Sequence, residues 1–117
     1  MNAFKPKGTK KDGPEAIIQE AVIAAMRAAD WEVIVTHGNE FQMGLPDLYC
    51  AHIVYATRWV EVKNPLAYSF TAAQLRVFPA LAAKGVGIWI LTSARPEELQ
   101  LLMKPPNWYQ YLPIFKR

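Results

Sequence analysis

Hydrophobic residues recur at two different spacings along the chain, and each spacing predicts a different kind of element. Spacings of three and four residues place apolar side chains on one stripe and predict helices. The predicted helices cover residues 15–29, residues 71–84 and a short segment that begins near Arg95 and Pro96. Pro14 suits the first turn of the first helix, and Gly85 ends the second.

Runs that are rich in β-branched and aromatic residues, or almost wholly apolar, predict strands instead. These runs cover residues 31–37, 47–55, 58–63 and 86–93. The second and third runs predict a hairpin that turns near Ala56 and Thr57. The fourth run is nearly all apolar, as expected of a strand that is buried on both faces. Residues 105–117 are aromatic and show no clear period.

The predicted order of elements is α-β-β-β-α-β-α, which is typical of an α/β fold. A helix between the third and fourth strands favours a right-handed crossover, and therefore a parallel pair at the centre of the sheet. We expect a mixed four-stranded sheet flanked by helices. A length of 117 residues fits one domain, predicted over residues 14–117 after a basic flexible tail over residues 1–13.

The net charge of +3 arises mainly at the N-terminus, where four lysines lie within the first eleven residues. Over the rest of the chain, nine Lys and Arg residues stand against ten Asp and Glu residues. A basic tail can contact phosphates without base preference, or it can be a solvated end with no partner; the composition leaves both open.

Other features of the composition narrow the class of protein. No apolar run approaches the roughly 20 residues that a membrane span needs, and no apolar segment of the kind found in signal peptides follows the first lysines. A single cysteine, Cys50, excludes an internal disulfide and a cysteine-based zinc site. A cytoplasmic protein with no membrane partner is the simplest expectation.

The residues best suited to chemistry are Asp47, Glu61 and Lys63. Asp47 follows Gly44-Leu45-Pro46 at the start of a predicted strand, and Glu61 and Lys63 lie fourteen and sixteen residues later in the next strand. Because side chains alternate along a strand, Glu61 and Lys63 share one face. If the two strands pair, Asp47 can approach Glu61.

Two neighbouring carboxylates repel each other unless a cation lies between them. Mg²⁺ favours carboxylates, backbone carbonyls and water, so Asp47, Glu61 and the carbonyl of Val62 are candidate metal ligands. Lys63 would then orient or deprotonate the attacking water, or neutralise a phosphate. These roles together predict metal-assisted hydrolysis of a phosphodiester bond.

Pro46-Asp47 and Glu61-Val62-Lys63 resemble the two halves of the motif of the PD-(D/E)xK nuclease superfamily. The similarity is greatest to its VRR-NUC family, which includes small stand-alone phage enzymes. There the Asp follows a Gly-x-Pro turn, an early helix carries a Glu-x-x-Ile-Gln pattern, and a helix after the third strand carries a Gln. The matching residues here are Gly44 to Asp47, Glu15 to Gln19, and Gln74.

The resemblance implies a restriction-endonuclease-like αβββαβ core and a DNA endonuclease that depends on Mg²⁺ or Mn²⁺. Stand-alone members of this type look like Holliday junction resolvases, which act as homodimers on four-way DNA junctions. A two-fold protein suits two nicks placed symmetrically across a junction. The roles of Asp47, Glu61 and Lys63 carry over directly, and those of Glu15 (metal) and Gln74 (site) follow by position.

Glu15 and Gln74 each have a second interpretation. An acid in a first helical turn is favoured by the helix dipole alone. However, Glu15 shares the buried stripe of Ile18 and Val22, whereas Glu20 falls on a more exposed face, which favours Glu15 over Glu20. Gln74 completes a capping box with Thr71, so it serves as a helix cap, a site residue or both.

The remaining polar and aromatic candidates are better explained by structure than by chemistry. His37 and His52 have no partner at ligand spacing, and His52 lies on the strand face opposite Asp47. Cys50 shares that face and is expected in the core. The C-terminal aromatic residues could stack on bases or line a dimer interface, but core packing is the simpler expectation: Trp108, Tyr109, Tyr111 and Phe115.

The leading hypothesis is therefore a homodimeric Mg²⁺-dependent endonuclease that acts on branched DNA. One alternative keeps the fold and the reaction but makes the endonuclease site-specific or indifferent to DNA structure. Another is a catalytically inactive DNA-binding accessory module, and binding alone does not require the Asp47, Glu61 and Lys63 set. A protein-protein adaptor would leave the Glu61 and Lys63 pair unexplained.

Overall fold

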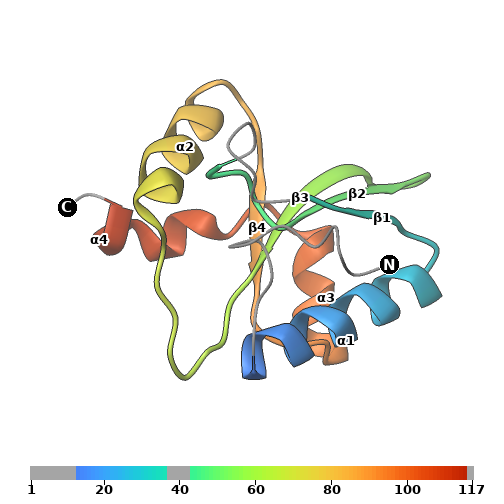
Figure 1. The fold of residues 1–117 in the computed structure, drawn as a ribbon. Coiled ribbons are helices and arrows are strands. Elements are labelled where there is room, and N and C mark those ends of the chain that lie inside the picture. The colour runs from blue at the N-terminus through green and yellow to red at the C-terminus, as the bar shows by residue number, and fades with distance from the viewer. Residues whose placement is uncertain (1–12, 37–42, 116–117) are drawn as a thin grey trace, which may run out of the picture.

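The computed structural model describes residues 13–36 and 43–115, which form a four-stranded sheet with helices on both faces (Figure 1). The longer elements are α1 (Pro14–Ala28), β1 (Glu32–Val35), β2 (Leu48–His52), β3 (Ala56–Val62), α2 (Ala72–Ala83) and β4 (Ile88–Leu91). Four short helices follow: α3 (Pro96–Leu99), η2 (Gln100–Met103), η3 (Trp108–Tyr111) and α4 (Leu112–Phe115). Every helix and strand predicted from the sequence has a counterpart here. His37 and all of the predicted tail except Gly13 lie outside the described residues.

The sheet has the strand order β1-β2-β3-β4 and is mixed, as predicted. Strands β1, β2 and β3 pair antiparallel, and β3 pairs parallel with β4 through the α2 crossover. The expectation of a parallel pair at the sheet centre is wrong, because β4 is an edge strand of the described sheet.

The Asn107 side chain covers the β4 edge: it accepts from the Ile90 amide at 2.6 Å and donates to the Ile90 carbonyl at 2.9 Å. It thereby satisfies two backbone groups that a further strand would otherwise bind.

Strand alternation sends side chains into two cores on opposite faces of the sheet. The core toward α1 includes Val22, Met26, Leu48, Cys50, Val60, Val62 and Leu91. The core toward α2 includes Phe70, Phe78, Ile88 and Ile90. Because the even-numbered residues of β2 and β3 face α1, the odd-numbered Asp47 and Glu61 face α2.

The β2–β3 hairpin turns earlier than the sequence suggests. Residues 53–55 form the turn, and Ala56 already belongs to β3, where it pairs with His52. Ala56 has a φ of 64°, a left-handed conformation usually taken by glycine in hairpins of this length. No Gly or Asn marks this position in the sequence. The turn predicted near Ala56 and Thr57 is therefore wrong, because the chain turns at residues 53–55.

The aromatic C-terminal segment forms the short helices η3 and α4, although its sequence shows no period. Trp108 and Tyr111 pack against the α2-side core, as the packing interpretation expects, whereas Tyr109 is 50% exposed. The rings of Phe70 and Tyr111 lie 5.9 Å apart at 67°, a favourable edge-on arrangement. The side chain of Phe115 lies outside what the structure describes.

Cys50 is fully buried in the α1-side core, as predicted. Burial away from water raises the pKa of its thiol to about 12, so the thiol stays protonated and unreactive at neutral pH. Among the described residues, no helix has both the length and the apolar content needed to cross a membrane.

Candidate functional site

The turn before β2 is held in place by a close contact with α2. Gly44 has a φ of 88°, and a Cβ added there would lie 2.8 Å from the Ala73 carbonyl oxygen and 2.7 Å from the Val77 side chain. Only glycine fits both the conformation and the space. On the other side, Thr36 donates its hydroxyl to the Pro46 carbonyl at 2.7 Å. The next residue, Asp47, is thereby fixed at the entry to β2.

We expect Gly44→Ala to be markedly more destabilising than Gly85→Ala, which provides a matched control. Both glycines have a φ near 90°, at 88° and 89°, but a Cβ at position 85 meets nothing within 4 Å. Gly85→Ala should lower the free energy of unfolding by about 1–2 kcal/mol from backbone strain alone. Gly44→Ala adds overpacking of about 1–3 kcal/mol. Urea unfolding of the two variants measures the difference, and equal losses would show that the contact with α2 is unimportant.

Asp47 and Glu61 lie side by side on neighbouring strands and are linked through the backbone. The pairing of Leu48 with Val60 places them opposite each other on the α2 face of the sheet. The Asp47 amide donates to Glu61 Oε1 at 3.1 Å, and the Val62 amide donates to Asp47 Oδ2 at 2.8 Å. The pairing of the two strands therefore brings Asp47 next to Glu61.

Lys63 is almost fully buried beside Glu61, with 4% of its surface exposed, and Glu61 is 0% exposed. Its Nζ lies 2.9 Å from Glu61 Oε2 and donates to Gln74 Oε1 at 3.3 Å. The same Nζ lies 4.6 Å from the centroid of the Phe70 ring, a cation–π contact. A buried ion pair of this kind contributes little net stability, because removing two charges from water offsets their attraction.

Gln74 links this ion pair to the start of α2. Its backbone amide donates to Thr71 Oγ1 at 3.0 Å and its Oε1 accepts from the Thr71 amide at 3.1 Å, which completes the predicted capping box. Its Nε2 also donates to Glu61 Oε2 at 2.9 Å. The predicted cap is therefore confirmed, and Gln74 also contacts the Glu61 and Lys63 pair.

The hydrogen bonds on Glu61 leave one acceptor position of its carboxylate unfilled within the described contacts. A carboxylate has about four acceptor positions. Within the described contacts, Glu61 Oε1 receives one donor, from Asp47, and Oε2 receives two, from Gln74 and Lys63. An acceptor position on Oε1, the oxygen that receives the Asp47 amide, is compatible with a further cationic partner.

Glu15 and Glu20 differ in exposure as the helical pattern predicts. Glu15 is half-buried and Glu20 is exposed. Gln19, one turn after Glu15, has a buried Oε1 with no hydrogen-bond partner among the described residues. In the described segments no group of three or more His, Cys, Asp or Glu side chains could hold a metal ion. The structure therefore brings Asp47 and Glu61 together without Glu15, whose metal role stays a prediction.

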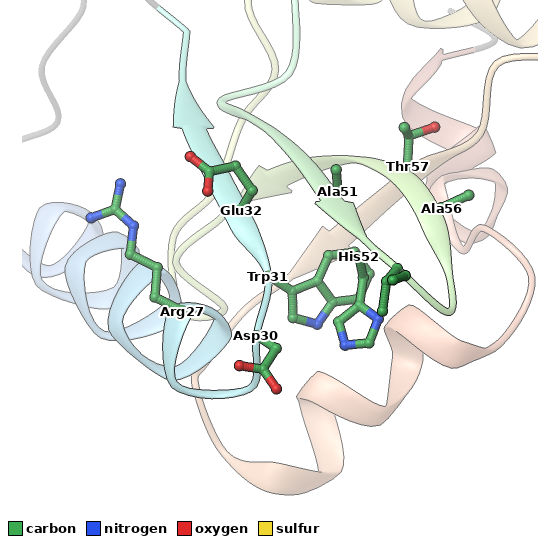
Figure 2. A pocket seen from close by; sticks show the side chains of 9 residues that line it. Arg27, Asp30, Trp31, Glu32, Ala51, His52, Ala56 and Thr57 are labelled. Atoms are coloured by element: carbon green, nitrogen blue, oxygen red, sulfur yellow. The ribbon is translucent and has the colours of Figure 1, made fainter.

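His52 lies at the far end of β2 from Asp47, beside a depression of about 620 Å³ (Figure 2). Its ring lies 5.0 Å from that of Trp31 and 4.9 Å from that of Tyr55. Its Nδ1 accepts a hydrogen bond from the Val54 amide at 3.0 Å. These contacts agree with the expected structural role of His52.

Phe70 is the residue of this site that the sequence did not single out. It lies directly before the Thr71 cap, and its ring covers the Lys63 ammonium. The available signal was an aromatic residue at the entry of a helix that carries a candidate site residue.

In comparisons with known proteins, this chain matches no protein-family model, no curated protein and no solved structure.

Proposed function

We propose that the chain is a metal-dependent endodeoxyribonuclease of the VRR-NUC type, built on a restriction-endonuclease-like αβββαβ core. The observation that carries this proposal is that the buried ion pair of Glu61 and Lys63 lies beside the partly buried Asp47, where β2 and β3 pair. A fold has no need of such a cluster for stability, since a buried ion pair is often no better than apolar residues of similar size. Ionisable groups that are buried without a gain in stability are often found at functional sites.

The residues present fit a hard divalent cation. Mg²⁺ commonly binds through one or two protein carboxylates and keeps several waters, and Asp47 and Glu61 supply two carboxylates. Their hydrogen bonds leave an acceptor position on Glu61 Oε1. Gln19 Oε1, a buried acceptor without a described partner, lies one turn from Glu15 on the same stripe of α1.

In this proposal Asp47, Glu61 and the Val62 carbonyl would hold Mg²⁺ or Mn²⁺, with Glu15 as a further ligand. When bound, the ion would supply Lewis acidity and a water of lowered pKa. Lys63 Nζ would orient the attacking water or neutralise the phosphate of the DNA strand. Gln74 keeps the Glu61 carboxylate and the Lys63 ammonium at a fixed separation, because it contacts both.

The substrate we propose is branched DNA, with Holliday junction resolution by a homodimer. The test compares cleavage of a four-way junction with cleavage of a duplex of the same sequence, in Mg²⁺ and in EDTA. We expect cleavage in Mg²⁺ alone, with the junction preferred. Cleavage in EDTA would overturn the metal mechanism. Equal cutting of both DNAs would leave an endonuclease indifferent to DNA structure, and binding without cleavage would favour an inactive accessory module.

The dual role of Gln74 gives a prediction with a matched control. Gln74→Leu removes both the cap and the contacts to Glu61 and Lys63, whereas Thr71→Ala removes the side-chain half of the cap alone. Thr71→Ala should lower the free energy of unfolding by about 0.5–2 kcal/mol. Gln74→Leu should lower it further, because it also removes buried hydrogen bonds to two charged groups. We expect only Gln74→Leu to lower the cleavage rate in Mg²⁺ by tenfold or more, for a lost interaction of about 1.4 kcal/mol. Similar rates for the two variants would reduce Gln74 to a helix cap.

A further inference from the structure

The sheet face that carries Asp47 and Glu61 also carries a row of apolar side chains. In the strand register Ile34 pairs with Tyr49, and Tyr49 pairs with Trp59. We call these three residues the apolar row. The rings of Tyr49 and Trp59 lie 4.8 Å apart at an angle of 53°. The apolar row therefore crosses three neighbouring strands on the α2 face.

This row is partly open to solvent, although Trp59 also packs against the α2-side core. Ile34 is 53% exposed, and Tyr49 and Trp59 are half-buried. In Figure 1, α2 lies beside β4, and the β2–β3 hairpin extends away from it. Neither the Tyr49 hydroxyl nor the Trp59 indole nitrogen forms a hydrogen bond with any residue in the described segments, and both rings keep a polar group for a partner.

The row lies next to the candidate site at a distance that a DNA strand can span. Tyr49 is two residues from Asp47, and Trp59 is two residues from Glu61, on the same face. Two residues of a strand span about 7 Å. Nucleotides stack at about 3.4 Å along one strand of a duplex, so a phosphate at Asp47 would place a base one or two positions away near the row.

The small size of the row argues for a flat, compact occupant rather than a second copy of the chain. Three partly exposed side chains offer a few hundred Å² at most, whereas a stable interface buries about 800 Å² on each partner. A nucleobase has the matching size and a π-face that stacks on aromatic rings. Bases are accessible for such stacking where they are unpaired.

We propose that Tyr49 and Trp59 form a stacking platform for an unpaired nucleobase beside the phosphodiester held at Asp47 and Glu61. The platform would select DNA with unpaired or unstacked bases close to the cleaved bond. This inference rests on the proposed nuclease function and names the feature of branched DNA that the enzyme recognises.

The test measures binding without cleavage, by fluorescence anisotropy of labelled DNA with the full-length protein in EDTA. The probes are a single strand of about 12 nucleotides and a blunt duplex of the same sequence. Any sequence serves, because stacking is sequence-tolerant, and this length lies within the site sizes of proteins that bind single strands. We expect Tyr49→Leu to weaken single-strand binding about tenfold and to change duplex binding less than twofold. Tyr49→Phe should bind like the wild type. Tyr109→Leu, which removes a tyrosine that is 50% exposed on η3, is the matched control and should have no effect.

A second variant and the cleavage assay separate the possible failures. Trp59→Leu should reproduce the Tyr49→Leu loss, and circular dichroism shows that each variant is folded. Unchanged single-strand binding in folded Tyr49→Leu would overturn the platform and leave the nuclease proposal intact if the wild type cleaves in Mg²⁺. Loss of binding in Tyr49→Leu with no cleavage by the wild type would support the platform and reject the nuclease. A change in oligomeric state of Tyr49→Leu without a change in DNA binding would also overturn the platform.

Discussion

Glu61→Gln is expected to destabilise the protein strongly and to abolish cleavage. Glu61 is fully buried and receives donors from Asp47, Gln74 and Lys63. The substituted amide turns one acceptor oxygen into a donor, so a donor faces another donor whichever way it points. It also leaves the Lys63 ammonium buried without its counter-ion, which costs roughly 3–5 kcal/mol. A domain of this size has only about 5–15 kcal/mol of stability, so the loss should be evident in urea unfolding.

The double variant Glu61→Gln, Lys63→Met separates the loss of stability from the loss of activity. Removing the stranded ammonium should recover most of the unfolding free energy, because a neutral buried pair avoids the desolvation penalty. Cleavage in Mg²⁺ should stay absent, since the carboxylate proposed to hold the ion is missing. If the recovered double variant cleaved DNA, Glu61 would be a structural residue and the proposed metal site would be wrong.

The chemistry-bearing face could be predicted from the sequence because it depends on local rules. Strand alternation alone places Glu61 and Lys63 on one face, and the pairing of β2 with β3 brings Asp47 to them. The capping box at Thr71 likewise follows from spacing, and the structure contains it. Where residue type and spacing determine the geometry, prediction and structure agree.

The features that could not be predicted depend on contacts between distant segments. Asn107 covers the β4 edge from seventeen residues away, and no local pattern marks an asparagine for that role. The cation–π contact of Phe70 with Lys63 requires the loop before α2 to fold back over β3. The turn at Ala56 was misplaced because the hairpin forces alanine into a conformation that its residue type disfavours.

Lys63→Met is expected to lower the cleavage rate by about 10²–10⁴-fold, because proton transfer by a single side chain contributes an effect of that size. DNA binding in EDTA should change little. Methionine preserves the length and apolar character of a side chain that is only 4% exposed. Lys63→Met leaves the Glu61 carboxylate buried without its counter-ion, which costs roughly 3–5 kcal/mol. Glu61 keeps the Asp47 amide and the Gln74 amide as donors, and circular dichroism shows whether the variant is folded. Single-turnover cleavage and anisotropy report the two quantities, and Lys84→Met, at an exposed lysine after α2, is the control.

Lys63→Arg then distinguishes the two roles that Lys63 can have in the proposed reaction. Arginine keeps the positive charge but does not deprotonate, and its planar guanidinium directs hydrogen bonds differently from an ammonium. If Lys63 neutralises the phosphate, Lys63→Arg should retain a measurable part of the activity that Lys63→Met loses. If Lys63 orients or deprotonates the attacking water, both variants should be equally inactive, because the buried site holds the Nζ between Glu61, Gln74 and the Phe70 ring. Full activity in Lys63→Met would exclude both roles and leave Lys63 as the counter-ion of Glu61.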